Sequence, residues 1–389
     1  MASSSLRSRT EPGSGELHMD ALYEILLRLP AKELCRLRVV CRPWRCLLSD
    51  PGFIAAHASR HPEPLVVASH DITCECHDEG RVLCDIMDIN GRVIKRFLAT
   101  GYYEWMPFAD LEFACIETRW TKNCHMLNLA TGDVISLPEE LSEEHAEREQ
   151  DFYEFRATVV FGQVASTREY KVFRVFDNGF FSNRNGLEKL CQVLTLDGSG
   201  SARWRGRKAP PGPVCMRRSS RVVVDGIAYF FLDEDSANQY VEPRGIASFD
   251  LLTEEWRVTL QGPKSNVGDN NCVDFYNMSL AALNSSLVVI HPTLNGSMDL
   301  WFLMDFERGL WIKQYSIQAN FSVERGENCP RPLFILNDGR IVTYVDAGGF
   351  LRICNPRTNT CTDVAELGHC LQVDLYSGSL LSLPNRGTS

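Results

Sequence analysis

A hairpin pattern that recurs about every fifty residues constrains the fold of this 389-residue chain more than any other feature. Each unit consists of a β-rich run, a polar Asp or Asn, a tight turn and a returning run that often carries Trp. The polar residues of the successive units are Asp88, Asn128, Asp197, Asp250, Asp305 and Asn355. A second hairpin precedes several of them, with its turn at Asp225-Gly226, Asn284-Ser285 or Asp338-Gly339. Asp-Gly tolerates the positive φ that two-residue hairpins need, so we expect two hairpins, or about four strands, in each repeat.

Four strands in about fifty residues, repeated some six times, predict a large all-β domain: a kelch-like β-propeller of about six blades. Radial repetition protects the strand edges that an open sheet exposes. Trp204, Trp256 and Trp311 recur with a similar spacing, and we interpret them as packing within the blades. The longest interval contains the acidic stretch from Glu139 to Asp151, which we interpret as an insertion in a blade.

The segment from Leu17 to His57 has helical periodicity instead, with Asp20 as a candidate N-cap and with Pro30 and Pro43 between successive helices. This pattern predicts three short helices in a small all-α module. A unit of about forty residues buries too little apolar surface to be stable alone, so we expect it to dock on the rest of the chain or on a partner. Its apolar residues at helical spacing are Leu22, Ile25, Leu26, Leu29, Leu34, Leu37, Val40, Cys41, Trp44, Leu47 and Leu48.

This module resembles an F-box, the adaptor-binding unit of cullin-RING ubiquitin ligases, in its plant form. The resemblance lies in the runs Arg28 to Lys32 (Arg-Leu-Pro-Ala-Lys), Val40 to Trp44 (Val-Cys-Arg-Pro-Trp) and Leu47 to Pro51 (Leu-Leu-Ser-Asp-Pro). Family members usually open with Leu-Pro, whereas His18 follows Leu17 here, and Ala21 replaces a larger apolar residue. We expect both departures to weaken adaptor binding without abolishing it.

The later hairpins resemble the F-box-associated domain that follows plant F-boxes. Their order and spacing carry this resemblance across about 320 residues, in segments such as Asn128 to Gly132, Val224 to Tyr229, Ala247 to Leu251 and Gly309 to Lys313. The predicted organisation is a disordered tail (1–16), an F-box (17–60), a linker (61–65), a propeller (66–385) and a second disordered tail (386–389).

The resemblance implies a non-catalytic substrate receptor. The F-box would dock on a Skp-type adaptor and through it on a cullin-RING ligase, and the propeller would recruit an unknown protein for ubiquitination and degradation. No cofactor and no metal are implied. The residues expected to contact the adaptor are Leu22, Ile25, Leu26, Leu29, Pro30, Leu34, Val40, Trp44 and Leu48.

Two alternatives stay open at this point. The propeller could bind a small ligand or a glycan, with a secondary F-box, since sugars stack on exposed aromatic rings. Tyr102, Tyr103 and Trp105, with Phe108 beside them, are the candidate substrate-binding residues for that reading, although burial in a blade competes with it. Alternatively, an F-box protein can bind its adaptor without any role in ubiquitination.

The net charge limits the classes of partner that we expect, and the cysteine content indicates the cellular compartment. A formal charge of −10 and a pI near 5.5 argue against nucleic acid as the main partner. The basic stretch from Arg203 to Lys208 we interpret as a solvated loop. No apolar run approaches the roughly 20 residues that span a bilayer. The 15 cysteines are odd in number and no signal-peptide pattern opens the chain, so we expect reduced, mostly buried thiols in a cytoplasmic or nuclear protein.

A candidate metal site is the cluster of Cys74, Cys76, His77 and Cys84, which offers sulfur and imidazole ligands. Its Cys-x-Cys spacing is not that of a paired zinc knuckle, and the region alternates like a strand. The sequence therefore predicts no metal site and no catalytic centre.

Overall fold

The computed structural model describes residues 19–61, 64–72, 81–100, 113–117, 124–128, 134–152, 156–177, 189–196, 202–215, 217–232, 245–263, 278–293, 295–319 and 329–376. The chain divides into two compact units, a helical unit and a β unit, with the boundary between Glu63 and Pro64. Among the helices of the described ranges, none has the length and apolar character needed to cross a membrane.

The described part of the helical unit contains four helices rather than the predicted three. They are α1 (Met19–Leu26), α2 (Ala31–Leu37), α3 (Arg42–Leu48) and α4 (Pro51–Arg60). The fourth helix begins where Asp50 accepts a hydrogen bond from the Phe53 amide at 3.0 Å, and Pro51 occupies its first turn. The sequence carries this cap signal, but the apolar periodicity predicts helices only as far as Leu48.

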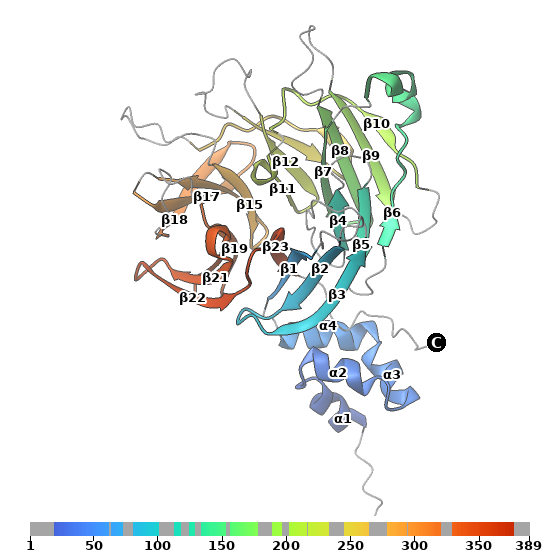
Figure 1. Cartoon of the computed structure of the whole chain (residues 1–389), viewed down its shortest axis with the longest axis vertical. Helices are drawn as coiled ribbons and strands as arrows, with labels where there is room; N and C mark the ends of the chain where they lie inside the picture. Colours follow the sequence, from blue (N-terminus) through green and yellow to red (C-terminus); the bar gives the residue numbers. More distant parts are fainter. Residues whose placement is uncertain are drawn as a thin grey trace, which may run out of the picture. The chain divides into compact units, whose positions relative to one another are not determined.

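Five four-stranded antiparallel sheets make up most of the described β unit. Figure 1 shows the sheets following one another in chain order around a common centre. Beginning with the strand that contacts the neighbouring sheets, three of them are β7 (Arg156–Gln163), β8 (Tyr170–Asp177), β9 (Leu190–Leu196) and β10 (Arg205–Arg207); β11 (Arg221–Val224), β12 (Ile227–Phe231), β13 (Ile246–Asp250) and β14 (Glu255–Trp256); and β15 (Ser279–Leu283), β16 (Ser286–Pro292), β17 (Ser297–Asp305) and β18 (Leu310–Gln318).

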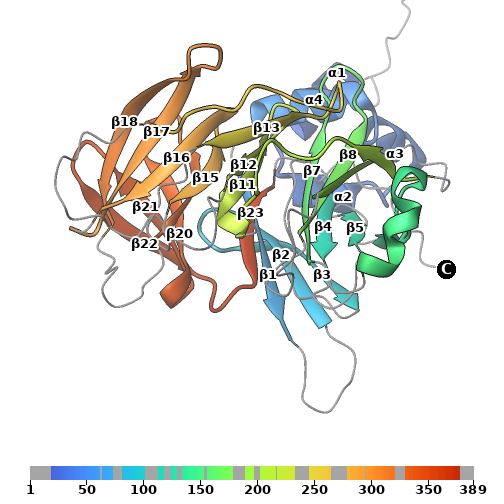
Figure 2. The ribbon, with the colours of Figure 1, turned by 90° about the horizontal axis from the view of Figure 1, so that it is seen from above.

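The remaining two four-stranded sheets include the one that closes the ring. There, the last strand of the described residues pairs with the first strand of the β unit, and Ser69 donates a hydrogen bond to the Gln372 carbonyl at 3.3 Å. Figure 2 shows the two strands side by side. These sheets are β19 (Arg331–Ile335), β20 (Ile341–Val345), β21 (Phe350–Asn355) and β22 (Thr360–Glu366), and β23 (Gln372–Tyr376), β1 (Leu65–Asp71), β2 (Arg81–Met87) and β3 (Val93–Thr100).

The predicted number of about six blades is corrected to five complete four-stranded blades in the described residues. A further sheet, of β4 (Phe113–Glu117), β5 (Cys124–Asn128) and β6 (Val134–Ser136), has three strands there. The repeat at Asn128 predicted a full blade because its hairpin, β5 to β6, matches the others. The residues before Phe113, from 101 to 112, lie outside the described part of the chain.

The two kinds of hairpin occupy different places in each blade. The Asp225-Gly226 and Asn284-Ser285 turns join the first strand of a blade to the second, and all four residues have positive φ. The polar residue of the other hairpin instead joins the third strand to the fourth. Its carboxylate or amide oxygen accepts backbone N–H groups of the turn, as Asp88 does from Asn90 at 3.0 Å and Asn355 does from Arg357 at 3.0 Å.

The recurring Trp residues join each blade to the one before it. Each indole N–H donates to a backbone carbonyl that follows the outer strand of the preceding sheet: Trp204 to Pro138 at 2.7 Å, Trp256 to Lys208 at 2.8 Å and Trp311 to Gln261 at 2.8 Å. We call this repeated hydrogen bond the blade lock. Together with the packing of the rings against buried residues, it confirms a structural role for these tryptophans.

The acidic insertion covers the edge of one blade. It forms a 3₁₀ segment, η1 (Glu143–Phe152), that contacts β10, and the Glu144 carboxylate accepts a hydrogen bond from the Gly206 amide at 3.0 Å. That bond lowers the pKa of Glu144. Two shorter 3₁₀ segments occur in the described β unit, η2 (Arg218–Ser220) and η4 (Asp346–Gly348).

The predicted solvated loop for the basic stretch is wrong for Arg205 and Arg207. Arg205 and Arg207 lie on β10 and, with Lys171 of β8, bind the carboxylate of Glu254, which lies in the β13–β14 turn of the next blade. The Lys171–Glu254 distance is 2.8 Å, and both side chains are less than 10% exposed. We call these four residues the Glu254 cluster. No local pattern predicts this cluster, because Glu254 is distant from its three cations along the chain.

The expectation of reduced thiols fails for one pair. Cys354 and Cys361 form a disulfide across β21 and β22. Five other cysteines of the described ranges are buried, namely Cys84, Cys124, Cys191, Cys215 and Cys370.

Candidate adaptor-binding surface of the helical unit

The helical unit has a core of its own. Leu26 and Leu27 at the end of α1, Leu34 of α2, Leu48 of α3 and Phe53 of α4 are each at most 5% exposed and pack together. Fully burying a Leu or Phe contributes about 1.5–3 kcal/mol, so each of these five side chains stabilises the packing of the helices by about that amount.

Buried polar groups tie the ends of the helices together. Arg38, which follows α2, is 1% exposed and donates to the Leu48 carbonyl at the end of α3. Burial lowers the pKa of its guanidinium. His57 of α4 donates from Nε2 to the Leu29 carbonyl at 2.9 Å. Burial likewise lowers the pKa of His57, although this hydrogen bond opposes the effect. These bonds fix the connections between helices, which carry several of the candidate residues.

The structure divides the nine residues predicted to contact the adaptor into three groups. Leu26, Leu34 and Leu48 are at most 1% exposed and belong to the core of the unit, so their assignment to the adaptor surface is corrected. The sequence did not separate them, because core-facing and partner-facing apolar residues share one helical period. Those that are half-buried are Leu22, Leu29 and Trp44, and those that are exposed are Ile25, Pro30 and Val40.

Two further apolar residues are exposed that the sequence did not predict as adaptor contacts. Met19 at the start of α1 is 58% exposed, and Val39, next to Val40 in the turn after α2, is 71% exposed. The sequence signal for Val39 is its place beside Val40, between a helix and Pro43. Two adjacent valines in a polar turn cannot both pack into the core of the unit. We call Met19, Ile25, Val39 and Val40 the exposed apolar set.

The surface of the helical unit combines paired polar side chains with exposed apolar ones. Two of the polar contacts link separate segments of the unit: Arg60 pairs with Glu24 at 2.8 Å, and His61 donates to the Leu27 carbonyl at 2.9 Å. The apolar side chains that remain at the surface offer area to a partner. Within the ranges that the structure describes, no group of three or more His, Cys, Asp and Glu is placed to hold a metal ion.

The candidate residues of the propeller lie mostly outside the described part of the chain. This applies to the aromatic residues Tyr102, Tyr103, Trp105 and Phe108, and to Cys74, Cys76 and His77 of the cluster weighed for metal. Its fourth member, Cys84, is buried in β2, and burial raises the pKa of its thiol to about 12.

Comparison with known proteins agrees with both units. Residues 16–55 match the F-box domain, and residues 111–364 match the F-box associated beta propeller domain. The F-box protein At3g07870 of Arabidopsis thaliana is 26% identical over 354 residues, covering 85% of this chain and 80% of that protein. The F-box/kelch-repeat protein At3g23880 of the same plant is 24% identical over 345 residues, covering 84% of each chain.

The match to the propeller family extends over most of the chain, and the F-box match precedes it. The helical unit with its exposed apolar set and the β unit of antiparallel blades are the two structural counterparts of these matches. The chain therefore belongs to the family of F-box proteins with an F-box-associated β-propeller domain, whose relatives here are plant proteins.

Proposed function

We propose that this protein is the substrate-receptor subunit of a Skp-cullin-F-box ubiquitin ligase. The exposed apolar set docks on a Skp-type adaptor, and the propeller recruits a target protein for ubiquitination and degradation. The protein itself supplies binding surfaces and no catalytic group. Its place of action is the cytoplasm or the nucleus.

One observation carries the proposal. The helical unit fills its own core with Leu26, Leu34 and Phe53, yet leaves Val39 and Val40 more than 60% exposed. A unit of this size gains from covering such residues, because apolar area removed from water contributes about 25 cal/mol per Å². A separate protein that supplies the cover fits the family's adaptor-binding role.

The test replaces two residues of the exposed apolar set, Ile25→Asp with Val40→Asp. Both side chains are exposed, at 46% and 61%, so the fold should survive while the interface acquires two carboxylates that docking would desolvate. Co-purification of the full chain with a recombinant Skp-type adaptor should disappear. Far-UV circular dichroism should retain its helical signal.

Val258→Asp is the matched control. It makes the same substitution at a valine that is 78% exposed in the β unit, so adaptor binding should be unchanged. Full retention of the adaptor by the double variant would refute the proposed surface.

A further inference from the structure

The last hairpin of the described blades departs from the Trp pattern. In the two blades before it, Trp256 stands six residues after Asp250, and Trp311 stands six residues after Asp305. In the next blade the residue six positions after Asn355 is Cys361. The hairpins correspond, because each of these residues is the second residue of the outer strand of its sheet.

Cys361 also takes the place of Trp in the blade lock. Its Sγ lies 3.5 Å from the carbonyl oxygen of Gln318, the last residue of the outer strand of the preceding blade. Trp311 reaches the Gln261 carbonyl in the same way one blade earlier. A thiol is a weak donor, so Cys361 in its reduced form would give a weaker version of the same contact between blades.

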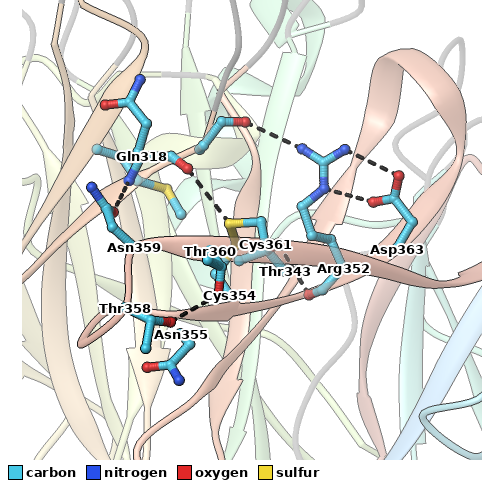
Figure 3. Close-up of a disulfide and its surroundings, with 12 residues drawn as sticks. Gln318, Thr343, Arg352, Cys354, Asn355, Thr358, Asn359, Thr360, Cys361 and Asp363 are labelled. Atoms are coloured by element: carbon cyan, nitrogen blue, oxygen red, sulfur yellow. Dashed lines mark hydrogen bonds and ion pairs between the residues drawn. A yellow bond between two sulfur atoms is a disulfide. The ribbon is translucent and has the colours of Figure 1, made fainter.

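The sulfur that makes this contact is also bonded within its own blade. Cys354 lies directly opposite Cys361 in the β21–β22 ladder, with a Cα–Cα distance of 4.1 Å, and the two sulfurs form a disulfide. Figure 3 shows Cys361 between Cys354 and the Gln318 carbonyl. A disulfide sulfur carries no hydrogen, so oxidation removes the donor of the blade lock.

We propose that Cys354 and Cys361 form a reversible redox pair that exchanges a contact between blades for a covalent bond within one blade. When both residues are thiols, Cys361 donates to the Gln318 carbonyl and couples the β19–β22 blade to the preceding blade. As a disulfide, the pair ties β21 to β22 and that coupling is lost. The burial of the two residues assigns their roles: Cys361 is half-buried and reachable, whereas Cys354 is fully buried behind it.

The exchange with a small-molecule disulfide such as oxidised glutathione is balanced. The Cys361 thiolate attacks one sulfur of the small disulfide, and the first molecule of small thiol leaves. The Cys354 thiolate then attacks the Cys361 Sγ, and the second molecule of small thiol leaves. The protein thiols lose two electrons and two protons, which the two released thiols carry away.

Other contacts hold the two blades together in either state. Asn359 accepts a hydrogen bond from the Gln318 amide at 2.9 Å, and Arg352 donates to the Ala319 carbonyl at 3.2 Å while pairing with Asp363. Oxidation therefore loosens one contact at this boundary without unfolding the blade. The effect should be confined to the end of β18.

The experiment equilibrates the full-length protein with mixtures of reduced and oxidised glutathione, followed by alkylation and peptide mass analysis. The peptide pair containing Cys354 and Cys361 should pass from doubly alkylated to bridged as the mixture becomes more oxidising. The exposed residue Cys46 serves as the internal control and should take up glutathione singly. Hydrogen exchange of the peptide from residues 310–319 should become about twofold faster in the bridged form, as expected for losing one weak hydrogen bond.

Two variants keep the inference falsifiable. Cys354→Ala keeps the Cys361 thiol but removes its partner, so no bridge can form and Cys361 should stop at the mixed disulfide, detected as a single glutathione adduct on its peptide. Absence of that adduct in oxidising mixtures would contradict the assignment of Cys361 as the attacking thiol. Cys361→Ser keeps a hydroxyl donor for Gln318 and should match the reduced wild type. Any of three results for the wild type overturns the inference. The pair stays bridged in reducing mixtures, Cys361 takes up glutathione without bridging, or the hydrogen exchange of residues 310–319 does not change on bridging.

Discussion

Replacing Glu254 by Gln should destabilise the propeller, because it removes the only carboxylate of the Glu254 cluster. The carboxylate lies in a turn of one blade and binds Lys171, Arg205 and Arg207 of the preceding blade. The Glu254→Gln variant keeps the size of the side chain and removes its charge. Lys171, at 7% exposure, is then left without a carboxylate partner.

The magnitude follows from two independent arguments. Breaking a buried ion pair by removing one partner costs about 3–5 kcal/mol. Burial would raise the pKa of Glu254, but hydrogen bonds from Arg205 and Lys171, with the charge of Arg205, outweigh it and lower the pKa from 4.5 to about 2. At 1.36 kcal/mol per unit of pKa, this corresponds to about 3 kcal/mol. Because Arg205 is 39% exposed and screened by solvent, we expect a loss of about 2–3 kcal/mol.

The assay is urea unfolding of the full chain at pH 7, followed by tryptophan fluorescence. Glu255→Gln is the matched control, since it makes the same change at the adjacent residue, which is exposed. The control should stay within about 0.5 kcal/mol of the wild type. Equal free energies of unfolding for the two variants would refute the reasoning.

The pH dependence gives a second check of the same cluster. A carboxylate with a lowered pKa contributes its full stability above its ordinary pKa, near 4.5, and loses it as the pH falls towards the folded-state value of about 2. The difference between wild type and Glu254→Gln should therefore shrink between pH 5 and pH 2. A difference that stays constant across this range would contradict the assigned charge.

Three further predictions concern packing, hydrogen bonding and protonation. Leu34→Ala should cost about 2–5 kcal/mol, because the side chain is 0% exposed, and should abolish the helical signal of the small unit; Val39→Ala, at an exposed site, should leave it intact. Trp311→Phe removes the bond to the Gln261 carbonyl and should cost at least about 1 kcal/mol in urea unfolding. Trp256→Phe should cost a similar amount, because it removes the same kind of bond to Lys208, and no loss in either would contradict the blade lock. Burial lowers the pKa of His57, so the folded unit favours the neutral ring, and its stability should fall as the pH drops below about 6.5. Helical melting at pH 7.5 and 5.5 should show this loss, and His57→Asn should reduce it; an unchanged melting temperature would count against it.

The hairpin turns were the most predictable part of the fold. Asp88, Asp250 and Asn355 bond their own turns, so the signal and the structure it specifies lie within a few residues. The blade count was less predictable, because a repeated hairpin reports only two strands of a blade. The hairpin at Asn128 belongs to a sheet with three strands in the described part.

The candidate adaptor surface was predictable in outline only. Apolar periodicity located the helices but gave Leu26 and Ile25 the same weight, although one is 1% and the other 46% exposed. Which of two neighbouring residues faces the core depends on how the helices pack, and that is a tertiary property. The ion pairs of Glu254 could not be predicted for the same reason, because its three cations lie 47 to 83 residues away along the chain.

The central claim is that the helical unit delivers proteins held by the propeller to a ubiquitin ligase. Proximity labelling in cells treated with a proteasome inhibitor tests it most directly, with wild type compared against the Ile25→Asp, Val40→Asp variant. We predict that both forms label the same target proteins. These targets should carry ubiquitin, and should be degraded once the inhibitor is removed, only in cells that express the wild type. Labelled proteins whose ubiquitination and turnover are the same with both forms would contradict the claim.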